Sequence, residues 1–390
     1  MKDNGNRKKY RESRGLRTGD AAAKRVLSLL LTVLLLLPSC LTLAEDTPDE
    51  PVFAEYEVET ERSLCDVLFW VIRELLPDEI RIRLCDDALY RRYREDMEFR
   101  SELLMQAGVY RSYTQYPGDN VVVIHPVEYY PATRILYAYW VEDPSCLTQR
   151  EQRTLKKAQS VISSLIRDDM TPLERETAVH DWMCRNITYY GKDESEYNSV
   201  RDGDMNERDC CVGALMNGKA DCDGYADTFV LLASLAQVGY IGRVEVQTYD
   251  GGNHMLNIVY LDDNWYLTDV CWDDGDGNCP TFRTCMNMGE HLAHYQYTWK
   301  PGLFDLSLKL NPDFYLVDNY FVHSPLDVYS GAQEAAEQIM QDYRDGYRYI
   351  VLKAGGTTPD ELFAALDQRQ RFCYWSQTKD DIVFFRILYY

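Results

Sequence analysis

The spacing of apolar residues predicts a mixed series of helices and strands in the first part of the chain. An apolar-rich stretch at 64–76 predicts a helix, and the strict alternation at 80–84 predicts a strand. Helical periodicity at 88–108 ends at a glycine. Residues 109–116 and 121–130 flank the turn residues 117–120 and predict a hairpin, and 135–141 is a further strand candidate.

Two helix starts in the middle of the chain carry clear capping signals. Thr148 and Glu151 form a capping-box pattern, and Thr171 with Glu174 forms a second one that has a proline, Pro172, in its first turn. We expect helices at about 148–168 and 172–187.

The end of the chain repeats the order of its beginning. A helix at 332–344, a strand at 347–353, a helix at 359–368 and a hairpin of 371–377 with 381–390 match the helix, strand, helix and hairpin of 64–130. The pattern indicates a weak internal repeat, and two unrelated α+β segments are the alternative.

The segment 218–226 stands directly before an apolar helix that ends at Gly239. This position places Cys222 in the first turn of the helix, where unpaired N–H groups and the positive end of the helix dipole favour a thiolate. The same N–H groups would stabilise an oxyanion. A buried structural cysteine is the alternative reading of Cys222 by itself.

A predicted hairpin supplies two partners for this cysteine. If Leu261 pairs with Asn264 across a two-residue turn, Leu256 opposes Asp269, and His254 is a diagonal neighbour of Asp269 on the same face of strands 255–261 and 265–272. Cys222 would then attack an amide as a thiolate, His254 would move the proton, and Asp269 would orient the imidazole.

Other histidines give weaker signals. His180 lies within a helix near Trp182 and is more typical of a structural histidine, and His291 with His294 lacks a second set of metal ligands. A zinc site built from Cys222, His254 and Asp269 would have no defined fourth ligand. We therefore expect neither a metal nor a cofactor.

Three segments in order resemble the transglutaminase-like superfamily as found in exported bacterial proteins. Residues 213–226 resemble the nucleophile segment, 254–257 the histidine segment, and 265–274 the aspartate segment. The resemblance covers about 146–300. It departs from the family pattern at Val212, Met255 and Leu256, near where substrate or an oxyanion would lie.

The resemblance implies an α+β fold with a papain-like core, in which the nucleophile helix packs on an antiparallel sheet. It also implies acyl-enzyme chemistry through a thioester on Cys222, His254 and Asp269. Substrate contacts are assigned on the same basis to Gly224, Tyr225, Asn257 and Trp272. We divide the chain into a signal peptide at 1–44, an N-terminal α+β domain at 45–145, the transglutaminase-like domain at 146–325 and a C-terminal α+β domain at 326–390.

The first residues have the pattern of an export signal. A basic region holds nine Lys or Arg within the first 25 residues and precedes an apolar run from 26 to 37. Cleavage after Ala44 would give a secreted protein, whereas lipidation of Cys40 would give a lipid-anchored one. An extracytoplasmic location follows in either case, with contact to a membrane only through the leader or lipid. Of the 12 cysteines, those other than Cys40 and Cys222 would permit up to five disulfides in an oxidising compartment.

Charge restricts the class of partner. The formal net charge of −22, without a basic patch beyond the leader, argues against binding to nucleic acid. Two functions remain. One is an exported cysteine enzyme that transamidates, deamidates or hydrolyses protein or peptide amides, with substrates that include cell-wall-associated ones. The other is a catalytically inactive cell-surface binding module on the same fold.

Overall fold

The computed structural model describes residues 53–190, 201–202, 205–248, 251–274, 283, 285–293, 297–298, 310, 320–322, 327–379 and 381–389. The export signal and Cys40 lie outside these residues. None of the helices described is long and apolar enough to cross a membrane.

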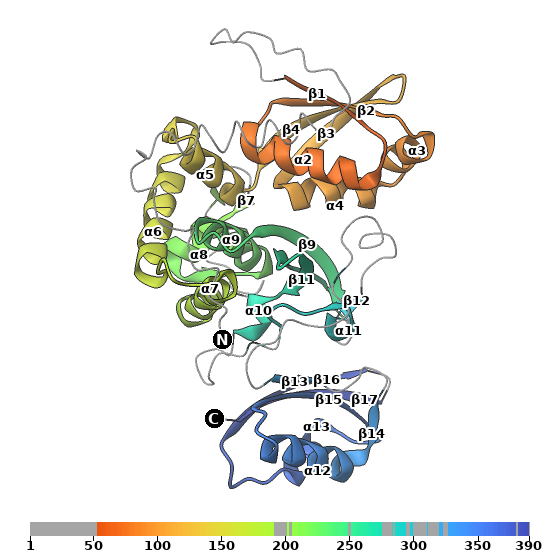
Figure 1. Cartoon of the computed structure of the whole chain (residues 1–390), viewed down its shortest axis with the longest axis vertical. Coiled ribbons are helices and arrows are strands. Elements are labelled where there is room, and N and C mark those ends of the chain that lie inside the picture. The colour runs from red at the N-terminus through yellow and green to blue at the C-terminus, as the bar shows by residue number, and fades with distance from the viewer. Residues whose placement is uncertain are drawn as a thin grey trace, which may run out of the picture. The chain divides into compact units, whose positions relative to one another are not determined.

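The first part of the chain forms a four-stranded sheet with helices on one face (Figure 1). In chain order its elements are β1 (Phe53–Val58), α2 (Glu61–Leu75), β2 (Glu79–Leu84), α3 (Asp87–Glu95), α4 (Met97–Ala107), β3 (Val109–Gly118) and β4 (Val121–Tyr129). The strand order is β1-β2-β4-β3, with β1 parallel to β2 and the other pairs antiparallel. The core lies between the sheet and the apolar faces of α2 and α4.

Two sequence predictions in this part need correction. The predicted strand at 135–141 is instead the helix α5 (Pro131–Trp140), which begins with a proline and buries Ile135, Leu136 and Ala138 at helical spacing. The single helix predicted at 88–108 is divided at Asp96, whose side chain accepts the Phe99 N–H and begins α4. An N-cap competes here with continuation of the helix.

The central part contains a helical layer and an antiparallel sheet. Its helices are α6 (Gln149–Leu165), α7 (Pro172–Asn186), α8 (Cys211–Asn217) and α9 (Cys222–Leu235), and both predicted capping boxes are present. The sheet has the order β11-β10-β9-β12, from β9 (Tyr240–Thr248), β10 (Asn253–Leu261), β11 (Asn264–Thr268) and β12 (Tyr297–Thr298). Helix α9 packs on β9 and β10 and contributes a run of buried apolar residues to one core. The predicted α+β fold, with the nucleophile helix on an antiparallel sheet, is therefore confirmed.

Short elements connect these helices and strands. They are the 3₁₀ turns at Pro144–Cys146 and Glu207–Asp209, the short strands β5 (Thr188–Tyr189), β6 (Arg201–Asp202), β7 (Met205–Asn206) and β8 (Lys219–Ala220), and the short helices α10 (Val270–Asp273) and α11 (Glu290–Ala293).

The final part repeats the topology of the first. Its elements are β13 (Tyr320–Val322), β14 (Val328–Ser330), α12 (Gly331–Arg344), β15 (Tyr349–Gly355), α13 (Pro359–Ala365), β16 (Phe372–Lys379) and β17 (Ile382–Tyr389). Strand β14 is parallel to β15, β15 pairs with β17, and β17 pairs with β16, as β1, β2, β4 and β3 do. The shared connectivity agrees with the internal repeat predicted from the sequence.

Candidate active site

Cys222 begins helix α9, as the sequence predicts. Asp221 is the N-cap residue, and its side chain accepts the Gly224 N–H at 3.2 Å. The Cys222 side chain is partly exposed, and its sulfur lies 3.9 Å from Oδ2 of Asp223. The thiol therefore sits at the positive end of a helix and remains open to solvent on one side.

Gly224 lies against the backbone of the segment before α8. A Cβ at this position would collide with the carbonyl oxygen of Arg208. Only glycine therefore allows the first turn of α9 to approach the backbone of Arg208 so closely. Gly224 is buried. Its position provides close packing behind Cys222, and its predicted contact with substrate stays a prediction.

His254 and Asp269 meet as the hairpin register predicts. Leu261 pairs with Asn264, and Nε2 of His254 lies 2.7 Å from Oδ2 of Asp269. The Cys222 side chain is near enough to the His254 ring to raise its pKa. Because Nε2 is engaged by the carboxylate, Nδ1 is the ring nitrogen left for the sulfur. The structure thus brings sulfur, imidazole and carboxylate together from three separate segments of the sequence.

Asp269 does not lie within a strand, contrary to the predicted strand at 265–272. Strand β11 ends at Thr268, and Asp269 is the N-cap of α10, whose Oδ1 accepts the Trp272 N–H at 3.0 Å. One carboxylate oxygen therefore holds the helix start and the other holds His254. This double use fixes the direction of the carboxylate.

Tyr297 is a member of the site that the sequence reasoning missed. Its hydroxyl donates to Oδ2 of Asp269 at 2.5 Å, the same oxygen that binds His254, and its ring stacks on His254 with centroids 6.1 Å apart. Trp272 stacks on His254 at 5.0 Å from another side. Tyr297 lies 28 residues beyond Asp269 on β12, and its sequence neighbourhood contains no motif that marks it.

The electrostatics of the site favour a protonated imidazole. Burial would lower the pKa of His254, but the charge and hydrogen bond of Asp269, together with Cys222, raise it to about 10. Burial would likewise raise the pKa of Asp269, yet His254, Tyr297 and the Trp272 N–H lower it. A negative carboxylate beside a positive imidazole is therefore the stable arrangement.

Acidic groups surround the start of α9. Burial and then the charges of Asp223 and Asp209 raise the pKa of Asp221 to about 8. Burial followed by Asp209 and Glu245 raises the pKa of Asp223 to about 6. Carboxyl groups thus crowd the start of α9 beside Cys222, and Arg208 pairs with two of them, Asp209 and Asp221.

The remaining residues assigned to substrate are mostly interior. Asn257 is 1% exposed, and its amide donates to the carbonyls of Ala226 and Gly242, which ties α9 to the sheet. Tyr225 is also buried, and its hydroxyl donates to Asp274. These contacts give Asn257 and Tyr225 a structural position, whereas Trp272 does face the His254 ring.

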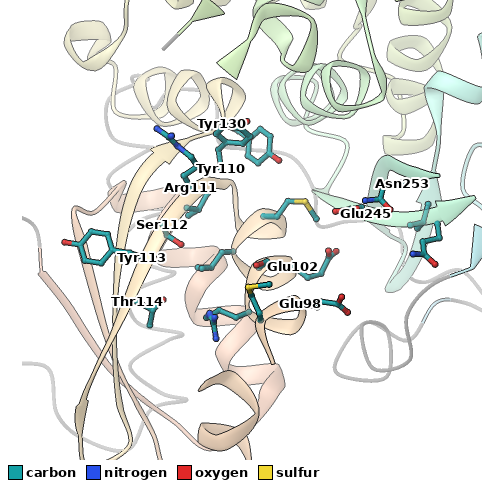
Figure 2. A pocket seen from close by; sticks show the side chains of 18 of the residues that line it. Glu98, Glu102, Tyr110, Arg111, Ser112, Tyr113, Thr114, Tyr130, Glu245 and Asn253 are labelled. Carbon is teal, nitrogen blue, oxygen red and sulfur yellow. The ribbon is translucent and has the colours of Figure 1, made fainter. Parts of the chain in front are cut away.

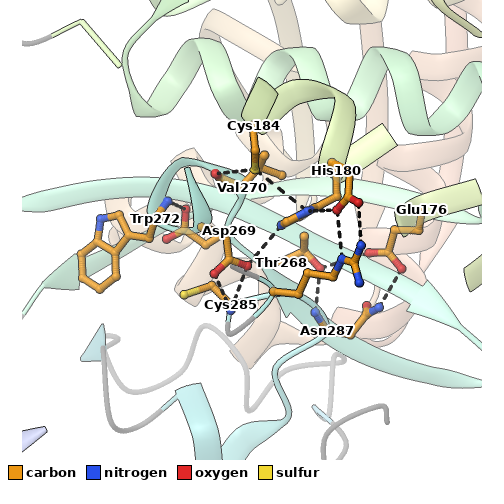
Figure 3. Close-up of polar contacts among 12 residues, drawn as sticks. Glu176, His180, Cys184, Thr268, Asp269, Val270, Trp272, Cys285 and Asn287 are labelled. Atoms are coloured by element: carbon orange, nitrogen blue, oxygen red, sulfur yellow. Dashed lines mark hydrogen bonds and ion pairs between the residues drawn. The ribbon is translucent and has the colours of Figure 1, made fainter. Parts of the chain in front are cut away.

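A second Cys–His–Asp group lies in the interior near the first (Figure 3). Nε2 of His180 is 3.1 Å from Oδ2 of Asp273, and Nδ1 of His180 is 4.0 Å from the sulfur of Cys184. His180 and Asp273 are fully buried. The structure thus gives His180 the satisfied polar partners expected of a structural histidine.

In the described residues nine cysteines, Cys222 among them, are in no disulfide, whereas Cys373 is disulfide-bonded. Cys222 is therefore not blocked by a disulfide. With these nine outside any disulfide, the five bridges that the cysteine count permits are not present among the described residues. Of the two histidines from which no metal site is expected, the side chain of His291 and all of His294 lie outside the described residues.

A family model described as the transglutaminase-like superfamily matches residues 159–270. The match contains Cys222, His254 and Asp269, whose contacts are those described above. Residues 159–270 form a transglutaminase-like domain.

Curated relatives match this chain over limited lengths. The human kyphoscoliosis peptidase is 31% identical over 30% of this chain and 18% of its own length, and the mouse protein is 29% identical over 39% of this chain and 23% of its own. The chain thus spans less than a quarter of these relatives. A solved structure titled "Crystal structure of a TGase" is 14% identical, with a TM-score of 0.25, over 56% of this chain and 59% of that one.

Proposed function

We propose that this protein is an exported cysteine enzyme that acts on protein or peptide amides through a thioester on Cys222. The observation that carries the proposal is the 2.7 Å contact between Nε2 of His254 and Asp269, with Cys222 near enough to the imidazole to raise its pKa. The free state and partial exposure of Cys222 support it, since a nucleophile must be reduced and reachable.

The proposed reaction has two steps. The Cys222 sulfur attacks the amide carbonyl carbon, and the imidazolium of His254 protonates the departing amine or ammonia as the thioester forms. A water molecule or an amine then attacks the thioester, His254 accepts its proton, and the sulfur leaves as thiolate. Asp269 stays ionised and holds the ring in both steps. The first turn of α9 offers N–H groups for the oxyanion.

The outcome of the second step depends on which nucleophile reaches the thioester. An amine gives transamidation, and water gives deamidation or hydrolysis. An amine probe and a glutamine-containing protein substrate test both possibilities together: incorporated probe and released ammonia are measured for the wild type and for Cys222→Ala. We expect both signals to require Cys222. Equal signals from the two proteins would contradict the proposal, and silence from both would favour the binding-module alternative.

The export part of the proposal rests on the leader at 1–44. It is tested by expressing the full chain and a Cys40→Ser variant and following each in the medium and membrane fractions. If both proteins are secreted into the medium, the result indicates cleavage near Ala44. If the wild type is retained in the membrane and the Cys40→Ser variant is not, the result indicates lipidation at Cys40. Retention of both proteins in the cytoplasm would contradict export.

A further inference from the structure

A cleft of about 670 Å³ lies between the first sheet and the transglutaminase-like domain (Figure 2). One face of α4 lines it, including Glu98 and Glu102. Strand β3 lines a second side, and Glu245 to Gln247 of β9 with Asn253 of β10 line a third. The sequence does not predict the cleft, because β9 lies more than 100 residues beyond α4 and β3 along the chain.

The β3 side of the cleft is the edge of a sheet. Strand β3 is last in the order β1-β2-β4-β3 and, among the strands described, pairs with β4 alone. Residues 109–114 all line the cleft. Because side chains alternate between faces in a strand, a cleft lined by consecutive residues runs along the edge, where main-chain N–H and C=O groups point outward. An extended chain could add to this edge as a further strand.

The opposite side of the cleft is acidic. Glu102 is 8% exposed, accepts a hydrogen bond from Gln106 at 3.1 Å and another from the backbone of Glu245. Burial, and then the charge of Glu245, raise the pKa of Glu102 to about 8. A positively charged group of a ligand placed beside Glu102 would offset both the burial of its carboxylate and the repulsion from Glu245.

The two arginines of the cleft are already engaged. Arg100 donates to the carbonyl of Tyr93 at 2.7 Å, and Arg111 forms an ion pair with Glu128 at 3.1 Å. Neither guanidinium therefore offsets the negative charge of Glu102 and Glu245. The side of the cleft formed by α4 and β9 therefore matches a basic ligand.

The cleft lies next to the candidate active site, although neither Cys222 nor His254 lines it. Asn253 lines the cleft and directly precedes His254. Tyr110 and Tyr130 also line it, and both lie near enough to Asp223, the neighbour of Cys222, for its charge to raise their pKa values after the larger effect of burial. A chain lying in the cleft would thus pass close to the active site.

We propose that this cleft binds an extended polypeptide substrate, which adds to the free edge of β3 and places a lysine or arginine side chain against Glu102 and Glu245. The inference rests on the proposed function in taking the bound chain as substrate. It assigns to the first sheet the role of selecting extended segments with a basic residue at a fixed distance from the reacting amide.

Binding is measured on the full chain carrying Cys222→Ala, so that turnover plays no part. The probes are glutamine peptides that each carry one lysine at a different position, matched with peptides in which norleucine replaces lysine. We expect one lysine position to bind about tenfold more tightly than its norleucine partner, which corresponds to about 1.4 kcal/mol. Equal binding at every position would overturn the proposal.

Two variants locate the basic contact. Glu245→Gln and Glu102→Gln should each remove the preference for lysine over norleucine, whereas Glu337→Gln, an exposed residue of α12, should keep it. Glu245 is exposed, so its substitution is the one that leaves packing undisturbed. A lysine preference that survives both cleft variants in folded protein would overturn the assignment to Glu102 and Glu245.

The strand addition has a test of its own. Peptides N-methylated at one amide at a time should lose affinity at every second position across the segment that pairs with β3, because alternate amides of an added strand face its neighbour. Uniform loss or no loss along the peptide would contradict strand addition. If the wild type binds lysine peptides preferentially but does not turn them over, the cleft inference stands and the proposed function is rejected. If the wild type turns peptides over without any preference for lysine, the proposed function stands and the cleft inference is rejected.

Discussion

The imidazole of His180 and the carboxylate of Asp273 meet 3.1 Å apart in the interior, one helical turn beyond Asp269. Asp273 also accepts the Cys285 N–H with both oxygens, at 3.0 and 2.9 Å, and its own N–H donates to the Asp269 carbonyl. The interior pair thus fixes the short helix α10, which begins with the carboxylate that holds His254.

Asp273→Asn should therefore lower stability. The substitution removes the charge on one side of a buried imidazole and leaves Asp181, 3.3 Å from its Nδ1, as the remaining carboxylate, at a cost of about 3 kcal/mol in the free energy of unfolding. Urea denaturation followed by circular dichroism measures it. Asp263→Asn, in the exposed turn between β10 and β11, is the matched control and should change little. An unaltered midpoint for Asp273→Asn would refute this view of the interior pair.

Asp269→Asn should abolish most of the activity while the fold persists. An amide can still cap α10, but it neither carries the charge nor fixes the tautomer that His254 requires. We expect kcat to fall by about 10³–10⁴-fold, as such changes do in related triads. The assay is the amine-incorporation reaction, with circular dichroism as the check on folding. Activity within a few-fold of the wild type would exclude Asp269 from the mechanism.

Tyr297→Phe should have a smaller effect at the same place. It removes the 2.5 Å hydrogen bond to Asp269 but keeps the ring stacked near His254. Loss of a hydrogen bond to a charged group costs about 1.5–3 kcal/mol, so kcat should fall about tenfold or more, with KM little changed. A rise in KM with kcat unaltered would instead indicate that Tyr297 contacts substrate.

The raised pKa of His254 makes part of the stability depend on pH. Its value is about 10 in the fold against 6.5 as the ordinary value, so the protonated ring stabilises the fold fully below pH 6.5 and loses this contribution as the pH rises towards 10. Between these limits the wild type should lose more unfolding free energy than His254→Gln. Urea titrations across this range compare the two. Parallel pH profiles would show that His254 is not held in its charged form.

Gly224→Ala tests the close packing behind Cys222. The added methyl group meets the Arg208 carbonyl, so either the start of α9 or the preceding backbone must move. We expect a lower melting temperature and slower alkylation of Cys222. Gly251→Ala, where a Cβ meets nothing nearby, is a control for space, although its positive φ of 84° adds some backbone strain. A normal alkylation rate in Gly224→Ala would show that this contact does not position the sulfur.

The sequence predicts the centre of the site because local rules determine it. The two-residue turn at Asp262–Asp263 sets the hairpin register that brings His254 to Asp269, and the capping boxes set the starts of α6 and α7. The strand predicted at 135–141 fails because a short apolar run does not distinguish a buried strand from a buried helix. Tyr297 and the cleft depend on packing between distant segments, which no local pattern records.

Alkylation of Cys222 by iodoacetamide near pH 6, followed by peptide mass spectrometry, tests the central claim most directly. The exposed thiols of Cys85 and Cys146 serve as references in the same sample. The pKa of each is raised, and partial burial of the sulfur is the main cause. We predict that Cys222 reacts many times faster than either, and that His254→Gln removes the difference. A Cys222 rate no greater than that of an ordinary thiol with a pKa of about 8.5 would contradict an activated nucleophile.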